Sequence, residues 1–243
     1  MAVSEGRKVT KFRGMEKLIY YEHLNYRDEC SFSPPNGKKM IKWSLFLLLF
    51  AMAGCSVSKN PLRKQVKFLQ KGLLKDDTSY VYALPYETGK KHRIVQGYFG
   101  VFSHKERAAL DFKMKRGTRI TAAREGVVVR VKEDSDRGGW SKKYAQSGNN
   151  IVIMHPDGTR AGYWHIQHNG AMVNVGDSVK RGQWIALSGK TGYAAIPHLH
   201  FLVWNAAGSG QWRQVATRFQ TSKGIKYLRT LKKYRRPKHS DYF

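Results

Sequence analysis

The segment Pro197-His198-Leu199-His200-Phe201-Leu202-Val203 carries the strongest fold signal in the sequence. Its residues favour β structure, and apolar residues recur at alternate positions, as expected for a strand with one face in a core. Because residues i and i+2 of a strand project from the same face, His198 and His200 are predicted to share a face. Two imidazoles there can act as a metal ligand plus an acid/base, as two ligands, or as polar groups on a solvent face.

Further candidate site residues lie upstream of this segment. His165 ends the β-like run Tyr163-Trp164-His165, and His104 precedes Asp111 with six residues between them. Two histidines and an aspartate are a typical ligand set of catalytic zinc, which leaves an open position for water. Zinc lowers the pKa of that water to about 7, and a further histidine can move protons at neutral pH.

Composition limits the classes of protein that fit. Of 243 residues, 41% are hydrophobic and 12% aromatic, which is enough for a packed core and excludes wholesale disorder. The 44 Lys and Arg against 17 Asp and Glu give a formal charge of +27. That charge predicts an anionic partner, such as nucleic acid, an acidic membrane surface or an anionic cell-wall polymer. The two cysteines, Cys30 and Cys55, exclude a disulfide-stapled scaffold and a cysteine-rich zinc finger.

Short β-rich runs separated by turn residues follow residue 79. They are predicted as strands over 80–84, 93–96, 108–112, 119–122, 126–131, 150–155, 160–166, 184–187 and 198–204. Many short strands of this kind indicate an all-β sandwich or barrel. Helices are expected only over 62–74, where apolar residues recur at helical spacing, and near 225–234.

The N-terminal part of the chain carries an export signal. Lys38, Lys39 and Lys42 precede an uncharged run over 43–58. The run is shorter than the roughly 20 apolar residues of a spanning helix and is typical of a signal peptide. It includes Met52-Ala53-Gly54-Cys55, which resembles a bacterial lipoprotein signal, in which the cysteine is acylated and becomes the first mature residue. The alternative is a signal anchor that contains a cysteine by chance.

The export signal divides the chain. Residues 1–54 are predicted as leader and signal, with translation starting at Met40 or, alternatively, with 1–39 as a genuine long leader. The leader holds nine Lys and Arg and five Asp and Glu, so its removal leaves +23 on the mature chain. Residues 55–79 are predicted as a basic tether, 80–212 as the catalytic domain and 213–243 as a basic tail. The tail, with ten Lys and Arg and one acid, is expected to bind anionic surfaces or merely to aid solubility.

Several blocks of sequence, taken in order from about residue 96 to 203, carry a family resemblance. They include Ser103-His104, Ala109-Leu110-Asp111-Phe112, Gly148-Asn149-Asn150-Ile151, Tyr163-Trp164-His165-Ile166, Val175-Gly176-Asp177 and Pro197-His198-Leu199-His200-Phe201. Together they resemble the lysostaphin/LytM-type peptidoglycan zinc metallopeptidases. The resemblance implies a compact β-sandwich or barrel-sandwich, of the duplicated hybrid motif type, with an active-site groove.

The resemblance also implies a role for each site residue. His104, Asp111 and His200 would hold one Zn²⁺, and His165 and His198 would be catalytic. The implied reaction is hydrolysis of peptide cross-links in peptidoglycan, within the cell envelope. A lipid anchor at Cys55, followed by Ser56 rather than aspartate, would place the protein at the outer membrane facing the periplasm. Export argues against nucleic acid as the partner.

This chain departs from the family pattern in its spacing. The family commonly has three residues between the first histidine and the aspartate, whereas six intervene here, so Glu106 is a rival to Asp111 as ligand. Ile196 and Leu202 also replace residues that are usually small and acidic, respectively. A catalytically silent adaptor that activates other wall hydrolases is the alternative function. Such adaptors lose metal-binding residues, whereas this chain keeps all five candidates.

Overall fold

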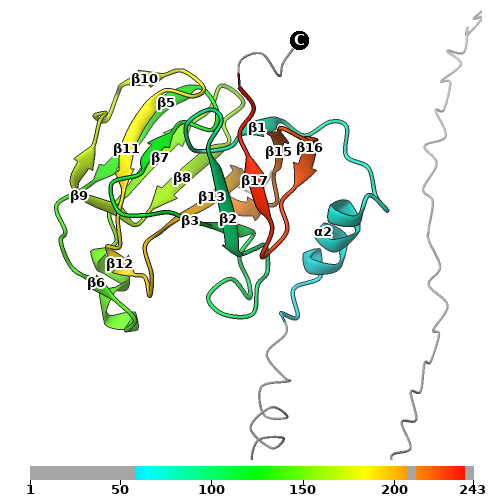
Figure 1. The fold of residues 1–243 in the computed structure, drawn as a ribbon, viewed down its shortest axis with the longest axis horizontal. Helices are drawn as coiled ribbons and strands as arrows, with labels where there is room; N and C mark the ends of the chain where they lie inside the picture. Colours follow the sequence, from blue (N-terminus) through cyan, green and yellow to red (C-terminus); the bar gives the residue numbers. More distant parts are fainter. Residues whose placement is uncertain (1–57, 207–211, 239–243) are drawn as a thin grey trace, which may run out of the picture. The chain divides into compact units, whose positions relative to one another are not determined.

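The computed structural model describes residues 58–206 and 212–238. The predicted leader 1–54 and Cys55 lie outside the described residues. The described chain is built almost entirely from short strands, and the prediction of an all-β fold is confirmed (Figure 1). Among these residues, no helix is long and apolar enough to cross a bilayer.

The elements have the following bounds. The helices are α2 (Leu62–Lys71) and the 3₁₀ helix η1 (Lys142–Ser147). The strands are β1 (Val81–Ala83), β2 (Lys91–Gln96), β3 (Ala109–Lys113), β4 (Arg119–Thr121), β5 (Gly126–Lys132), β6 (Gly138–Gly139), β7 (Asn150–Met154), β8 (Arg160–Trp164), β9 (Ile166–Ala171), β10 (Ser178–Val179), β11 (Trp184–Ser188), β12 (Gly192–Tyr193), β13 (His198–Ala206), β14 (Trp212–Val215), β15 (Arg218–Thr221), β16 (Gly224–Tyr227) and β17 (Lys233–Arg235).

A nine-stranded sheet is the main scaffold. Its order is β10-β5-β7-β8-β13-β3-β2-β17, with β14 paired to the far part of β13. All of its neighbouring pairs are antiparallel. Strand β13 lies at its centre between β8 and β3, which explains why its sequence shows the clearest alternation. Smaller sheets have the orders β4-β11-β9, β1-β15-β16 and β12-β6.

One face of the main sheet packs into the core. Leu199, Phe201 and Val203 of β13 are buried there. The Phe201 ring contacts Tyr163 and Phe219, with centroids 5.3 and 5.8 Å apart. Residues of the smaller sheets, such as Ile120, join the same apolar cluster. The other face of β13 is therefore left free to carry polar residues.

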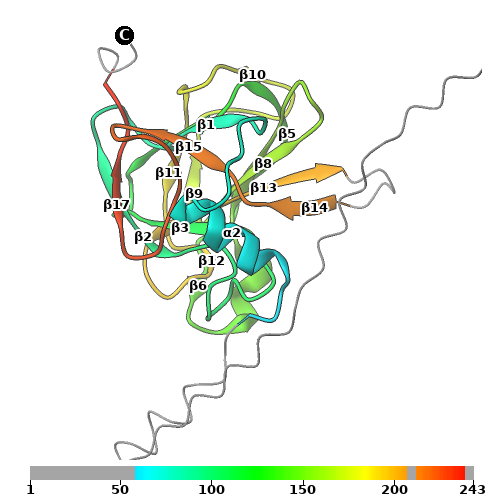
Figure 2. The same ribbon diagram turned by 90° about the vertical axis from the view of Figure 1, so that its right-hand side faces the viewer.

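The C-terminal segment belongs to the fold and is not a free tail. Strand β15 pairs parallel to β1, and β16 pairs with β15 (Figure 1). Strand β17 pairs with β2 and forms one edge of the main sheet (Figure 2). The helix predicted near 225–234 is wrong, because this stretch forms the end of β16, a turn and β17. Phe219 and Leu228 are buried in the core and hold the segment in place, while most of the basic side chains point outward.

The predicted tether also contacts the domain. Helix α2 ends at Lys71 and is capped by Gly72, whose φ of 74° is the left-handed conformation that glycine favours at a helix C-terminus. Val66 is buried, and Gln70 Nε2 donates a hydrogen bond of 2.6 Å to the carbonyl of Leu228. Further upstream, the hydroxyl of Ser58 donates to the carbonyl of Lys105. From Ser58 onward this segment is thus bound to the domain.

Candidate metal centre and active site

Strand register brings the site residues into one row across the main sheet. Asp111 on β3 lies opposite His200 on β13, which lies opposite Trp164 on β8. Because directly paired residues project to the same side of a sheet, these three side chains share a face. His198 lies two residues before His200 and shares that face too. The prediction that His198 and His200 point the same way is confirmed.

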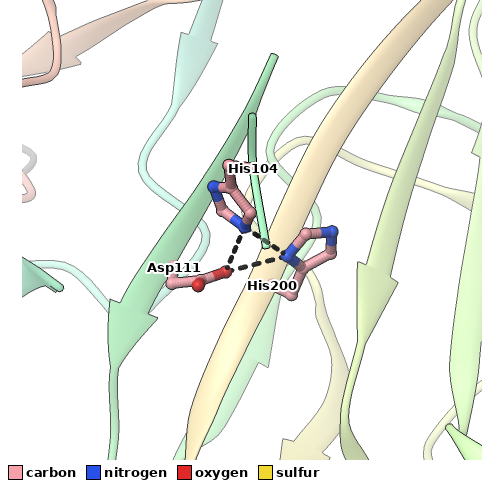
Figure 3. A group of neighbouring side chains, drawn as sticks. All are labelled: His104, Asp111 and His200. Atoms are coloured by element: carbon pink, nitrogen blue, oxygen red, sulfur yellow. Dashed lines mark hydrogen bonds and ion pairs between the residues drawn. The ribbon is translucent and has the colours of Figure 1, made fainter. Parts of the chain in front are cut away.

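Three of the predicted residues converge (Figure 3). Asp111 Oδ1 lies 2.8 Å from His200 Nδ1 and 3.2 Å from His104 Nε2, and the two histidine nitrogens are 3.1 Å apart. All three residues are buried. Their ligand atoms lie within 4.8 Å of one another, which makes them a group able to hold a metal ion.

The loop after β2 positions His104. The backbone N–H of Arg107 donates to the His104 carbonyl at 2.9 Å, and the N–H of Phe99 donates to the Arg107 carbonyl at 2.9 Å. These bonds fold the six intervening residues back on themselves, so that His104 and Asp111 meet despite their separation in sequence. His104 Nδ1 is 3.1 Å from the carbonyl of Gly97, to which it donates. In the neutral ring, the lone pair is therefore on Nε2, which faces Asp111.

Electrostatics favour a cation at this point. Burial alone would raise the pKa of Asp111, but the charge on His104 and hydrogen bonds from His104 and His200 hold it well below its usual range. Burial lowers the pKa of His200 to about 4, against the pull of Asp111. The group consists of one carboxylate that faces one ring nitrogen from each of two imidazoles. This donor set fits Zn²⁺, whose tetrahedral ligand atoms lie about 3.4 Å apart.

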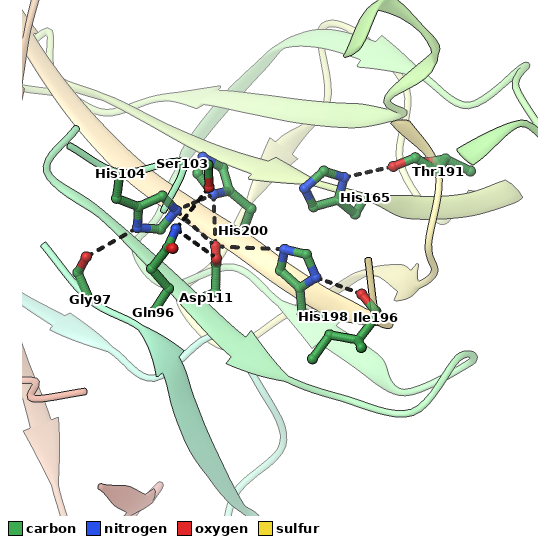
Figure 4. Close-up of polar contacts among 10 residues, drawn as sticks. All are labelled: Gln96, Gly97, Ser103, His104, Asp111, His165, Thr191, Ile196, His198 and His200. Carbon is green, nitrogen blue, oxygen red and sulfur yellow. Dashed lines mark hydrogen bonds and ion pairs between the residues drawn. The ribbon is translucent and has the colours of Figure 1, made fainter. Parts of the chain in front are cut away.

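Two further histidines flank this group (Figure 4). The ring of His165 lies 4.6 Å from that of His198 and 5.9 Å from that of His200, measured between centroids. His165 Nδ1 is 2.6 Å from the carbonyl of Thr191, and His198 Nδ1 is 2.7 Å from that of Ile196. His198 Nε2 lies 3.7 Å from Asp111 Oδ1. Each ring thus turns Nδ1 to the backbone and leaves Nε2 for the site.

His165 has an unusual backbone conformation. Its φ is 66°, in the left-handed region that non-glycine residues seldom adopt. It stands between the end of β8 and the start of β9, and such strain is a known feature of functional sites. Burial, and then the neighbouring His198 and His200, lower the pKa of His165 to about 3. Its ring is therefore neutral at physiological pH.

The residues that support these side chains carry no motif in the sequence. Gln96 Nε2 donates to Ser103 Oγ at 2.8 Å and lies 3.4 Å from Asp111 Oδ2. The Thr191 and Ile196 contacts use backbone carbonyls, which leave no mark on residue identity. Gln96 could be identified as a supporting residue only from the strand register, in which it pairs with Asp111.

The rival carboxylate does not join the group. Glu106 is exposed and accepts a hydrogen bond of 3.0 Å from Asn60 Nδ2. His168 is also exposed. His155 is buried with Nδ1 2.6 Å from the carbonyl of Glu125, as expected for a structural residue. Of the two departures from the family pattern, Ile196 is exposed and Leu202 is buried beside the site row.

Comparison with known proteins assigns this domain to a family. Residues 105–212 match the model of peptidase family M23. The chain contains an M23 peptidase domain. The match includes Asp111, His165, His198 and His200, and it begins directly after His104. The resemblance to lysostaphin/LytM-type peptidases, which the sequence motifs predict, is confirmed.

Named relatives of the M23 domain are cell-wall peptidases. Lysostaphin of Staphylococcus simulans is 40% identical over 92 residues, which are 38% of this chain and 17% of the relative. Peptidoglycan DD-endopeptidase ShyA of Vibrio cholerae is 35% identical over 91 residues, 37% of this chain and 18% of the relative. The chain thus spans less than a fifth of the length of these two relatives. The crystallised catalytic domain of lysostaphin from S. simulans is 33% identical, covering 51% of this chain and 87% of that one, with a TM-score of 0.38.

Proposed function

We propose that this chain is a zinc-dependent endopeptidase that hydrolyses peptide cross-links of bacterial peptidoglycan. The observation that supports it best is the convergence of His104, Asp111 and His200 beside two more histidines in an M23 domain. The relatives named for peptidoglycan cleavage support the same substrate. A catalytically silent adaptor would not need five polar side chains kept together in a buried site.

The chemistry follows from the protonation of the site. A bound zinc ion would supply a Lewis acid and lower the pKa of a coordinated water. Because the Nδ1 atoms of His165 and His198 donate to carbonyls, Nε2 of each ring is left to act in the site. Nε2 of one ring can take the proton of the attacking water and return it to the leaving amine. Nε2–H of a protonated ring can donate to the developing oxyanion.

Metal analysis and peptidoglycan digestion test this function together. The purified chain is expected to hold one zinc per molecule and to release peptide fragments with new amino and carboxyl ends, identified by mass spectrometry. A chelator should stop cleavage, and added zinc should restore it. If the protein binds no zinc and cleaves no peptidoglycan, the adaptor function would be favoured over the enzyme.

We further propose that Cys55 is acylated and anchors the protein in the cell envelope, at the outer membrane. The uncharged run that includes Met52-Ala53-Gly54-Cys55 supports this localisation. Cys55→Ser is expected to move the protein from the membrane fraction to the soluble fraction or to stall its processing. An unchanged mass and fractionation of the Cys55→Ser variant would contradict the anchor.

A further inference from the structure

Aromatic residues continue the site face of the main sheet beyond the metal centre. Counting along β13 from His200, the residues on the same face are Leu202 and Trp204. Trp204 pairs with Arg160 on β8 and with Gln214 on β14. Trp164 lies in the same row as His200, and the two rings are 6.0 Å apart between centroids. The metal centre and these tryptophans therefore lie on one continuous surface.

Gly162 makes room for the two indole rings. It lies between Arg160 and Trp164 on β8, directly opposite Leu202. A Cβ built on Gly162 would lie 2.0 Å from the Trp164 ring and 3.0 Å from the Trp204 ring, so both rings lean over the glycine. Their centroids are 5.4 Å apart at an interplanar angle of 69°. Leu202, the residue opposite Gly162, is buried.

Trp212 extends the same surface. The guanidinium of Arg160 lies 4.2 Å from the centroid of the Trp212 ring, and Trp212 is 43% exposed. Trp164 and Trp204 are half-buried. Arg160 Nε and Gln214 Oε1 are buried and have no hydrogen-bond partner in the described chain. We call Trp164, Trp204, Trp212 and Arg160 the aromatic shelf.

We propose that the aromatic shelf binds sugar rings of the glycan strand whose peptides are cut at the metal centre. This inference rests on the proposed function. Indole faces pack well against the C–H faces of pyranose rings, because they are large, rigid and apolar. Ligand sites typically combine such apolar surface with a few hydrogen-bonding groups, here Arg160 and Gln214. The Arg160 guanidinium, always protonated, complements the acyl and carboxylate oxygens of acidic amino sugars.

The spacing of the shelf suits a polymer that carries peptides on a sugar chain. Trp164 lies beside His200, with ring centroids 6.0 Å apart, and the Trp204 ring lies 5.4 Å from that of Trp164. The shelf therefore begins at the metal centre and continues along β13, so that a sugar chain can lie on it while its attached peptide enters the site.

Binding of a pure sugar tests the shelf without any hydrolysis. The probe is N-acetylchitotetraose, a β-1,4-linked tetramer of N-acetylglucosamine, titrated into the full chain and followed by the NMR signals of the indole N–H groups. The signals of the shelf tryptophans are expected to shift. Trp204→Ala and Trp212→Ala should each raise Kd by about tenfold or more, whereas Trp204→Phe should retain most of the binding.

Two other tryptophans are matched controls. Trp140 is 76% exposed, and Trp184 stacks on Arg119 outside the shelf. Trp140→Ala and Trp184→Ala should leave Kd unchanged within about twofold. Absence of binding to the wild-type protein, or equal losses in the shelf and control variants, would overturn the proposal. The metal-free protein should bind the tetramer equally well. Sugar binding can therefore be measured even if the chain is not a zinc peptidase.

Kinetics separate sugar from peptide as the occupant of the shelf. On intact peptidoglycan, Trp204→Ala should raise KM with little change in kcat, and on a cross-linked peptide without sugars it should change neither. Equal impairment on both substrates would mean that the shelf binds peptide, and the proposal would fall. Wild-type protein that binds the tetramer but cuts neither substrate would instead overturn the proposed function alone.

Discussion

Neighbouring residues of β13 point to two faces of the main sheet that differ in chemistry but little in exposure. His198 and His200 on the site face are each 8% exposed, and Leu199 and Phe201 on the core face are 0% and 1% exposed. The core face is held by apolar contacts. The site face tolerates burial because its polar atoms have partners, such as the carbonyl of Ile196 for His198 and the Asp111 carboxylate for His200. The two faces show that burial alone does not distinguish residues that stabilise the fold from residues that form the site.

Removing a metal ligand should break the site face most severely. His104→Ala, Asp111→Ala and His200→Ala are each expected to lose most of the zinc and all activity on purified peptidoglycan, because in the proposed enzyme three ligands would hold the ion. Metal content is measured beside hydrolysis. Glu106→Ala, the nearest carboxylate outside the group, is the control and should keep both. If Glu106→Ala empties the site while Asp111→Ala does not, the ligand assignment is wrong.

Removing a flanking histidine should separate catalysis from metal binding. His165→Ala and His198→Ala are expected to keep zinc but lose about 10²–10⁴ in rate, since in the proposed mechanism they would act on protons and the oxyanion. His168→Ala, at an exposed histidine, is the control and should match wild type. The assignment within His198-Leu199-His200 would be reversed if His198→Ala lost the metal and His200→Ala retained it.

Changes on the core face should alter stability and not chemistry. Phe201→Ala is expected to lower the free energy of unfolding by about 3–5 kcal/mol, through lost contacts and a cavity beside Tyr163 and Phe219. Denaturant unfolding measures the loss, and Ile225→Ala, at an exposed position, should change it by less than about 0.5 kcal/mol. The folded fraction should still bind zinc. Loss of zinc without loss of stability would show that the two faces are not independent.

The sequence predicted several strands well because each is a run of β-favouring residues bounded by turn residues. The predicted segments 126–131, 184–187 and 198–204 differ from β5, β11 and β13 by no more than two residues at either end. The strands β15 to β17 were not predicted. They are three or four residues long, crowded with Lys and Arg, and depend on Phe219 and Leu228 reaching a core formed elsewhere.

The candidate site was predictable as a list of residues but not as an arrangement. Motif order gave His104, Asp111, His165, His198 and His200, all of which the structure brings together. The six residues between His104 and Asp111 could not be understood from spacing, because backbone bonds at Arg107 and Phe99 fold the loop back. The sequence alone could not place Trp204 beside Trp164, since its partners across the sheet become known only with the strand register.

The hydrogen bond from the Ser58 hydroxyl to the Lys105 carbonyl would limit the distance between a lipid-anchored Cys55 and the domain of the proposed enzyme. Ser58 stands three residues after Cys55, and three extended residues span about 10 Å at most. Lys105 follows His104 directly. An acylated Cys55 would therefore hold the loop that carries His104 close to the bilayer. Such a hydrolase could contact only the layer of peptidoglycan that lies next to the membrane in which it is anchored. Growth or remodelling that brings the polymer close to that membrane would then decide where cutting occurs.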